Sequence, residues 1–389
     1  HFDHLGCLRM QRRVTRAGGR IVDRHYASAL PEGAPLDVGE DDALDRLDKV
    51  LMDSVSVHQR SDVPYGMFLS GGIDSSALLA CMARLNEKPV RAFTAGFPGT
   101  GVPDERMLAK RVAAAVGAEH VEIAAIAAAM DDPAADYAAL PTYLLAAEAA
   151  KDLKVVLCGE GGDELFAGYG RYRSAARSIW LGGKPMWRRG ALDGTGVLRD
   201  SSKHWRDGII AAERRIASKG GTRLQQAQAL DCTDWLPNDL LLKVDRCLMA
   251  HGLEGRTPFL DPVVADFAYR LPDALKVADG KGKYLLRRWL ERALPQAEPF
   301  SRKRGFTVPV ADWMRPRAHA LGPLVAASAG IAEICHPEKV KDLYRSFTSR
   351  DETSLGHACW RLLFYALWYT VHVEQRAVQD DVFAMLEAK

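Results

Sequence analysis

Short apolar runs alternate with segments of helical periodicity over residues 41–160. The pattern predicts strands at 66–69, 90–95, 120–123 and 154–158. Helices are predicted at 41–57, 75–85, 104–116 and 140–151 because their apolar positions recur at helical spacing. Strands and helices in such alternation are typical of a parallel sheet with right-handed crossovers. We therefore expect an α/β fold in which ligands bind at the carboxyl ends of the strands.

The pattern changes on both sides of this region. Residues 1–40 contain a predicted short hairpin, 13–15 with 21–23, and a proline-containing linker at 30–36. From about residue 175 the periodicity is mostly helical. We therefore divide residues 41–389 into an α/β core, 41–174, and a mainly helical part, 175–389.

The first predicted strand runs into Ser70-Gly71-Gly72-Ile73-Asp74-Ser75, which opens a predicted helix. A glycine-rich turn at a helix N-terminus presents backbone N–H groups and partial positive charge to an anion. The spacing is neither that of a P-loop nor that of a dinucleotide fingerprint. Asp74 would repel a phosphate unless Mg²⁺ bridged the two. The loop therefore predicts a site for pyrophosphate and metal, hence ATP, and a plain capped turn is the alternative.

A second polar group follows the strand predicted at 154–158. Glu160, Asp163 and Glu164 stand within five residues, beside three glycines. Carboxylates this close repel one another unless a cation or a catalytic proton offsets their charge. In a parallel sheet this loop would lie beside the first, so Asp74 and Asp163 are candidate ligands of one Mg²⁺. For Glu164, a solvated helix-capping residue is an equal alternative.

Two lysines are candidate phosphate contacts. Lys283 stands just before a predicted helix, and Lys303 lies in the basic run 301–304. A lysine ammonium is a mobile point charge that suits a phosphate. The alternative for both is the basic start of a surface helix.

The composition narrows the classes of partner. The 389 residues include 52 basic and 50 acidic ones, for a net charge of +2, so neither nucleic acid nor an anionic membrane is expected as a partner. No apolar run approaches the roughly 20 residues that span a bilayer. The seven cysteines are scattered, so we expect a cytoplasmic protein without a zinc site or a disulfide framework.

Together these motifs resemble the C-terminal synthetase domain of glutamine-hydrolysing asparagine synthetases, in the ATP pyrophosphatase family. The resemblance covers residues 41–320 and includes, besides the loops, the segments 242–246, 249–254, 256–261 and 282–287. It implies a parallel five-stranded sheet flanked by helices, of the adenine-nucleotide alpha-hydrolase type. It also implies that ATP and Mg²⁺ adenylate the side-chain carboxylate of aspartate with release of pyrophosphate. Ammonia would then attack the β-aspartyl-AMP to give asparagine.

The resemblance also implies roles for single residues. Asp74 and Asp163 would bind the metal, Glu160 would be the general base for the attacking amine, and Lys283 would steady the phosphate charges. The implied ATP contacts are Phe68, Leu69, Ser70, Gly71, Gly72, Asp74, Ser75, Ala95, Cys158, Gly159 and Lys303. Cys158 stands where the family usually has serine, and we interpret it as a backbone contact because no Cys–His couple accompanies it.

The sequence departs from the family at its start. The family's N-terminal half is a glutaminase with an N-terminal cysteine nucleophile, whereas this sequence begins at His1 and has its first cysteine at Cys7. We therefore interpret residues 1–40 as a remnant of that domain and its linker, and expect no glutaminase activity from this sequence. The expected partners are aspartate or another carboxylate, ammonia or glutamine, the glutaminase domain and, as an open alternative, a second copy in a homodimer.

Other functions stay open at this point. The first is a related adenylating amidotransferase or a cyclase of the lasso-peptide or β-lactam type, with a different carboxylate or amine. Glu160 argues against the β-lactam type, which works with a Tyr–Glu pair. A tRNA-modifying enzyme would favour a more basic surface. A regulator without catalysis would not need Asp74, Asp163 and Lys283 intact.

Overall fold

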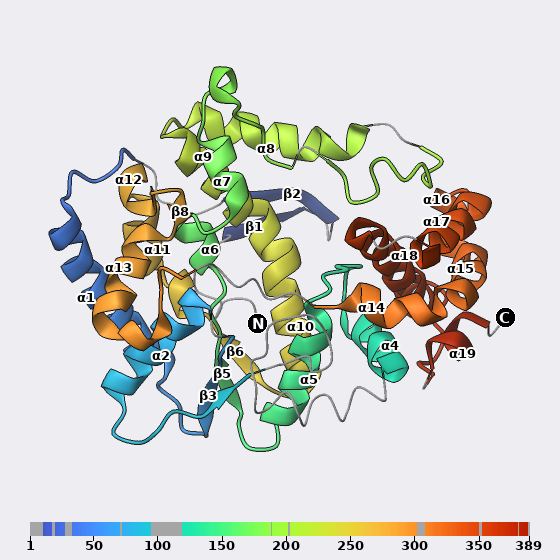
Figure 1. The fold of residues 1–389 in the computed structure, drawn as a ribbon, viewed down its shortest axis with the longest axis horizontal. Coiled ribbons are helices and arrows are strands. Elements are labelled where there is room, and N and C mark those ends of the chain that lie inside the picture. The colour runs from blue at the N-terminus through green and yellow to red at the C-terminus, as the bar shows by residue number, and fades with distance from the viewer. Residues whose placement is uncertain are drawn as a thin grey trace.

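The computed structural model describes residues 11–17, 20–27, 33–70, 72–94, 119–187, 189–200, 203–301, 308–349, 352–379 and 381–387. Within them, a small parallel sheet lies among many helices (Figure 1). The order of its four strands is β4 (Ala92–Phe93), β3 (Tyr65–Phe68), β5 (Val155–Leu157) and β6 (Glu254–Arg256). The predicted α/β fold with a parallel sheet is confirmed, although the described residues supply four strands where five were expected.

The strand β5 separates two parts of the hydrophobic core. All three of its residues are buried, as is typical of a parallel strand that is covered on both faces. Val155 and Leu157 belong to one core cluster, whereas Val156 and Cys158 belong to another. This follows from the alternation of side chains along a strand. The apolar run that predicted β5 therefore reflects two covered faces.

Different helices cover the two faces of the sheet. The face of Val155 packs against α1 (Glu40–His58), α2 (Ile73–Leu85), α11 (Pro262–Tyr269) and α13 (Tyr284–Ala293). The face of Val156 packs against α5 (Ala139–Ala149) and α10 (Leu241–Met249). The helices predicted at 41–57, 75–85 and 140–151 are confirmed as α1, α2 and α5.

The strand predicted at 120–123 is wrong, because these residues lie inside α4 (Glu119–Ala129). A short apolar run has the same appearance in a buried helix as in a strand, and the alanines that follow favour a helix. Ala124, Ile126 and Ala127 are buried in the core of the C-terminal helices.

The edge strand β6 was not predicted, because its three residues are mostly polar. The helix predicted at 104–116 lies outside the described residues.

The chain after residue 175 is mostly helical, as predicted. Its last part, from residue 308 on and dark orange to red in Figure 1, packs around α18 (Thr353–His372) together with α4. Besides short 3-10 turns, the described residues also form α6 (Gly162–Leu165), α7 (Gly170–Ala175), α8 (Asp207–Ser218), α9 (Arg223–Leu230), the π-helix η5 (Asp231–Leu240), α12 (Asp273–Lys276), α14 (Val310–Met314), α15 (Ala318–Ala327), α16 (Ala329–Ile334), α17 (Pro337–Ser349) and α19 (Val382–Glu387).

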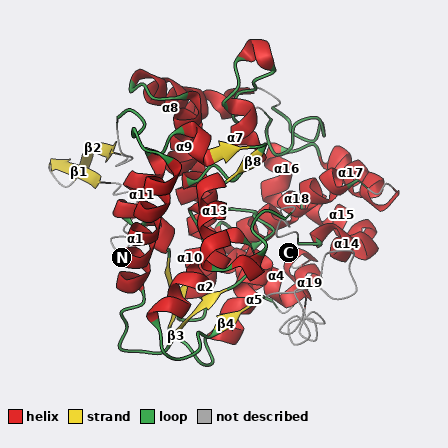
Figure 2. Cartoon of the chain, turned by 60° about the vertical axis from the view of Figure 1, so that its left-hand side comes forward, coloured by secondary structure: helices red, strands yellow, loops and turns green. Residues whose placement is uncertain are grey.

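Two antiparallel pairs complete the strands of the described chain, and Figure 2 shows how little of that chain is strand. The predicted hairpin is confirmed as β1 (Gln11–Ala17) with β2 (Arg20–Ala27), and it is longer than predicted. The other pair is β7 (Val277–Ala278) with β8 (Lys281–Gly282). Part of the linker predicted at 30–36 lies outside the described residues. No helix in the described ranges is both long enough and apolar enough to span a bilayer.

Candidate active site

The loop between β3 and α2 is held in shape by its own serines. The Ser75 hydroxyl accepts a hydrogen bond from the Ser70 N–H at 3.2 Å and donates one to the Gly72 carbonyl, also at 3.2 Å. The two serine hydroxyls lie 3.1 Å apart. Gly72 precedes α2, and no side chain caps the helix there, so the first turn can accept an anion instead. Gly71 lies outside the described residues.

The loop after β5 lies directly against this first loop. A Cβ at Gly159 would lie 3.2 Å from the Asp74 Cβ, and a Cβ at Gly162 would lie 2.5 Å from the Asp74 carboxyl carbon. Real Cβ atoms do not approach other atoms as closely as 2.5 Å, so Gly162 lets the two loops meet. The sequence predicted that these loops would be neighbours, and the packing of Asp74 on Gly159 and Gly162 confirms it.

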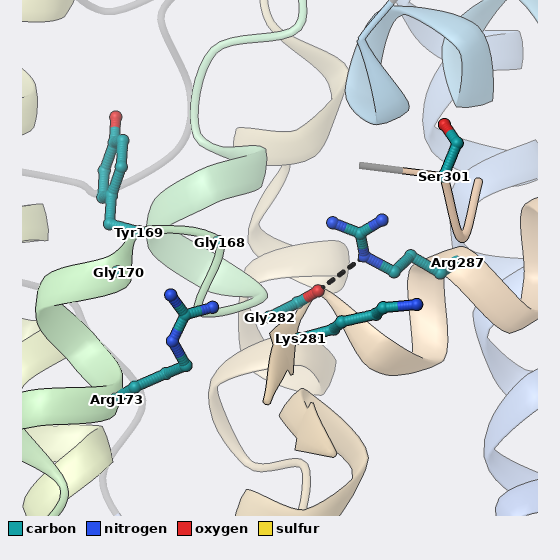
Figure 3. Close-up of a pocket in the computed structure, with 8 residues that line it drawn as sticks. All are labelled: Gly168, Tyr169, Gly170, Arg173, Lys281, Gly282, Arg287 and Ser301. Atoms are coloured by element: carbon teal, nitrogen blue, oxygen red, sulfur yellow. Dashed lines mark hydrogen bonds between the residues drawn. The ribbon is translucent and has the colours of Figure 1, made fainter. Parts of the chain in front are cut away.

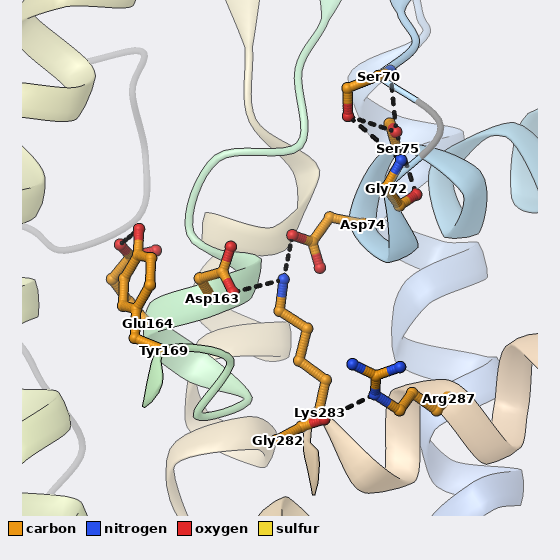
Figure 4. A network of polar contacts seen from close by, with 10 residues as sticks. All are labelled: Ser70, Gly72, Asp74, Ser75, Asp163, Glu164, Tyr169, Gly282, Lys283 and Arg287. Carbon is orange, nitrogen blue, oxygen red and sulfur yellow. Dashed lines mark hydrogen bonds and ion pairs between the residues drawn. The ribbon is translucent and has the colours of Figure 1, made fainter. Parts of the chain in front are cut away.

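Lys283 lies between the carboxylates of the two loops (Figure 4). Its ammonium forms ion pairs with Asp74 and, at 2.8 Å, with Asp163, and its side chain is only 3% exposed. Burial by itself would lower the pKa of Lys283, but Asp163 and Asp74 outweigh it and raise the pKa. Lys283 is therefore charged, and two acidic groups from different loops converge on one cation.

The backbone of Lys283 is in the left-handed region, with φ of 58°. This conformation costs a long side chain on the order of 1 kcal/mol or more. It is held by the hydrogen bond from the Lys283 N–H to the Phe166 carbonyl at 2.9 Å. Ala167, the neighbour of Phe166, also has a positive φ, of 56°. Strain at a buried charged residue is typical of functional sites, so the local fold holds this ammonium in place at a cost.

The donor set fits a magnesium–nucleotide complex. In the described part of the chain, no group of three or more His, Cys, Asp or Glu side chains could hold a metal ion. Asp74 and Asp163 provide two carboxylates around one cation position. Mg²⁺ commonly binds one or two protein carboxylates and takes its remaining ligands from phosphates and water. The two aspartates could therefore hold a metal that arrives with a nucleotide.

Glu160 has a different charged environment from Asp163. Burial raises the pKa of Glu160, the Lys243 ammonium opposes this, and Asp136 adds to it. Lys243 is itself buried and donates a hydrogen bond to Asp136 at 3.0 Å. A carboxylate whose pKa is raised in this way accepts a proton more readily than an ordinary carboxylate.

The interpretation of Glu164 as a solvated capping residue is wrong. Glu164 is 1% exposed and accepts a hydrogen bond from the Tyr169 hydroxyl at 2.7 Å. Burial, with the nearby Asp163 charge, raises the pKa of Glu164 to about 7. Glu164 is one of the buried residues of α6, which the sequence pattern did not reveal.

The remaining predicted contacts lie at the ends of the strands or outside the described chain. Phe68 ends β3, and the Leu69 N–H donates to the Phe93 carbonyl at 2.8 Å. The Cys158 N–H donates to the Arg256 carbonyl at 2.8 Å, and burial raises the pKa of its thiol well above the ordinary value. A protonated, buried thiol suits a backbone contact better than a nucleophile. Ala95 and Lys303 lie outside the described residues.

The sequence reasoning missed two groups of residues around the site. Lys243 lies in the motif 242–246, but no role was predicted for it. Asp136, which accepts its hydrogen bond, is 107 residues away in sequence. Arg287 lies one helical turn after Lys283 and donates to the Gly282 carbonyl at 2.8 Å. Lys243 and Arg287 lie in the segments 242–246 and 282–287 that resemble the family, and this was the signal in the sequence that could have pointed to them. Their contacts can be seen only in the folded structure.

A parallel sheet between helices, with a glycine-rich loop and an acidic loop after two of its strands, defines the class of this protein as α/β. Residues 46–371 match the family described as asparagine synthase, and the chain belongs to this family. The match includes Asp74, Glu160, Asp163 and Lys283.

Known relatives carry related names. Asparagine synthetase [glutamine-hydrolyzing] 1 of Bacillus subtilis (strain 168) is 31% identical over 94% of this chain and 65% of its own length. A Mycobacterium tuberculosis (strain H37Rv) protein, provisionally named as a glutamine-hydrolysing asparagine synthetase, is 34% identical over 92% of this chain and 62% of its length. Amidase chyE of Penicillium rubens is 31% identical over 68% of this chain and 52% of its length. The chain thus spans less than two thirds of the length of each of these relatives.

Proposed function

We propose that this chain catalyses ATP-dependent amide formation, in which a carboxylate is adenylated with release of pyrophosphate and then attacked by ammonia. The observation that carries the proposal is the placement of Lys283 between Asp74 and Asp163, beside the Ser70–Ser75 loop. Family membership supports it. Displacement at a phosphorus centre depends mainly on positioning and charge neutralisation, and this cluster supplies charges of both signs.

The residues around the cluster have separate tasks in this proposal. ATP with Mg²⁺ would supply the adenylyl group and the bridging cation. Asp74 and Asp163 would hold the metal. Lys283 would offset negative charge on the phosphates. The loops would position the nucleotide through backbone and hydroxyl contacts from Phe68, Leu69, Ser70, Gly71, Gly72, Ser75, Ala95, Cys158 and Gly159, with Lys303 as a further phosphate contact. Residues 41–174 would carry the nucleotide, and the helical part would complete the substrate site.

Glu160 is the proposed general base for the second step. Ammonia must lose a proton after it attacks the adenylated carboxylate, and a nearby carboxylate can accept it. The raised pKa of Glu160 makes it a stronger base than an ordinary carboxylate, and the charge of Lys243 opposes this rise. The proposed acyl substrate is the side-chain carboxylate of aspartate, as the names of the relatives suggest. In a longer protein, a glutaminase domain would release the ammonia from glutamine.

Amide formation with another carboxylate or amine is the second candidate. The relative named amidase chyE supports it, as does the hydrogen-bonded pair of Tyr169 and Glu164 beside Asp163. Such a pair could take a proton from an amine that belongs to the substrate itself.

Product analysis distinguishes the two candidates. The purified chain is incubated with ATP, Mg²⁺ and ammonium, together with aspartate or one of a panel of other carboxylates. AMP, pyrophosphate and the amide product are then identified by mass spectrometry, with Asp74→Asn as the inactive control. Asparagine formation supports the first candidate, and amide formation only with another carboxylate supports the second. No AMP or pyrophosphate with any carboxylate would contradict both.

A further inference from the structure

A cavity of about 330 Å³ lies beside the Lys283 cluster (Figure 3). Gly168 and Gly282 form part of its wall. A Cβ at Gly168 would overlap both the Asp163 carboxylate and the Lys283 side chain. Gly168 therefore borders both the cavity and the cluster.

Three cationic side chains from different elements line this cavity: Arg173 of α7, Lys281 of β8 and Arg287 of α13. Each donates to a backbone carbonyl, at 2.7 Å to Gly280, 3.0 Å to Phe300 and 2.8 Å to Gly282, respectively. Among the residues that the structure describes, none of the three forms an ion pair with a carboxylate. A carbonyl carries no net charge, so the cavity keeps a surplus of positive charge.

For the buried Arg287, this positive charge is costly without an anion. Burial lowers the pKa of Arg287, and the positive charge of Arg173 lowers it further. The carboxylates that stabilise the charged form of Arg287 are Asp74 and Asp163, which already share the Lys283 ammonium. Arg287 and Lys283 thus depend on the same two carboxylates, and a multiply charged anion in the cavity would offset the added charge of Arg173 and Lys281. Guanidinium groups favour such oxyanions because they donate two hydrogen bonds at once.

We propose that the cavity is a second anion site that receives inorganic pyrophosphate when it leaves the Ser70–Ser75 loop. A polyphosphate fits this cavity better than the carboxylate of the acyl substrate does. The cavity borders Lys283, the proposed phosphate contact, whereas the acyl substrate has to lie near Glu160, whose charged neighbours are Lys243 and Asp136. The Ser301 hydroxyl is available as a further donor at the cavity wall. The inference rests on the proposed function, because it needs pyrophosphate as a product.

The test measures pyrophosphate binding while the first loop is occupied. The full chain is saturated with a nonhydrolysable ATP analogue and Mg²⁺ and then titrated calorimetrically with inorganic pyrophosphate. One pyrophosphate per chain is expected to bind. In Arg173→Gln/Lys281→Gln, which removes the less buried cations and keeps Arg287, the Kd is expected to rise at least tenfold, because two charged hydrogen-bond donors to the anion are lost. Exposed Arg214 and Arg215 of α8 provide the control double variant with the same change of charge.

Each outcome decides a separate point. No pyrophosphate binding to the analogue-saturated chain, or an unchanged Kd in the double variant, would overturn the second site. If the double variant instead loses affinity for aspartate and keeps its affinity for pyrophosphate, the cavity binds the acyl substrate and the proposal is wrong. If the analogue itself fails to bind, the proposed function fails. The comparison of wild type and double variant with pyrophosphate alone then still tests the cavity.

Discussion

The Tyr169 hydroxyl donates a hydrogen bond of 2.7 Å to a Glu164 carboxylate that is almost fully buried. The pKa of Glu164 is raised from 4.5 to about 7, so the folded protein binds this proton more tightly than the unfolded chain does. Its contribution to stability is therefore greatest below pH 4.5 and is lost as the pH rises to about 7. The shift corresponds to about 3 kcal/mol.

We therefore expect Glu164→Gln to lose less stability than the wild type when the pH rises from 5 to 8. Glutamine has the shape of the neutral carboxyl and can still accept the hydrogen bond from Tyr169. Urea unfolding at both pH values measures the difference, and Glu87→Gln, at an exposed position, is the matched control. Parallel pH dependence in Glu164→Gln and the wild type would show that Glu164 does not titrate in this range.

Removal of the charge of Lys283 or of Asp74 should abolish ATP–pyrophosphate exchange. Lys283→Ala leaves Asp74 and Asp163 facing each other without their shared cation, and Asp74→Asn removes one carboxylate from the metal position. We expect exchange to fall by at least a factor of about 10², which is the effect of losing one well-placed electrostatic contact. Exchange of radiolabelled pyrophosphate into ATP measures this, with exposed Lys184→Ala as the control. Exchange close to wild type in either variant would contradict the assignment of this site.

Glu160→Gln should separate the two steps of the reaction. Without a general base, the rate of amide formation is expected to fall by a factor of roughly 10²–10⁴. ATP–pyrophosphate exchange should continue, because Lys283, Asp74 and Asp163 are unchanged. Initial rates of both reactions on the same preparation provide the comparison. If both fell equally, Glu160 would act in adenylation or in folding, and not as the base for ammonia.

Gly162→Ala should disturb catalysis through packing alone. Its Cβ would lie 2.5 Å from the Asp74 carboxyl carbon and force the two loops apart. Overpacking of this kind costs typically 1–3 kcal/mol, and we expect at least a tenfold loss of exchange activity. Gly208→Ala is the matched control, because its Cβ would meet no atom within 4 Å and alanine favours α8. Thermal unfolding of both variants shows whether the loss of activity exceeds the loss of stability.

Local patterns in the sequence predicted the parts of the site that lie close together along the chain. The apolar run of β5 and the glycines around Asp74 and Asp163 are such patterns, and they located both loops. Two other features depend on distant contacts. β6 is a strand because it pairs with Val155–Leu157, and its own residues have little strand character. Residues 120–123 are helical because Ala124 and Ala127 bury against distant helices, so a four-residue apolar run could not decide between the two structures.

The partners of the buried charged residues could not be predicted from the sequence pattern either. Lys243 and Asp136 contact each other across 107 residues, and a basic residue in a polar motif gives no sign of its partner. For Lys283, the motif predicted a site residue, but neither its burial nor its left-handed backbone could be read from the motif.

Lys283 follows Asp74 by 209 residues in the chain, which has a consequence for biosynthesis. Folding on the ribosome proceeds from the N-terminus, so both acidic loops are synthesised long before their counter-charge. A nascent chain that ends before residue 283 would bring Asp74 and Asp163 together without a cation and could not form a complete nucleotide site. If the cluster binds ATP as proposed, this ability arises only once residue 283 has been synthesised, and shorter nascent chains would not sequester nucleotide.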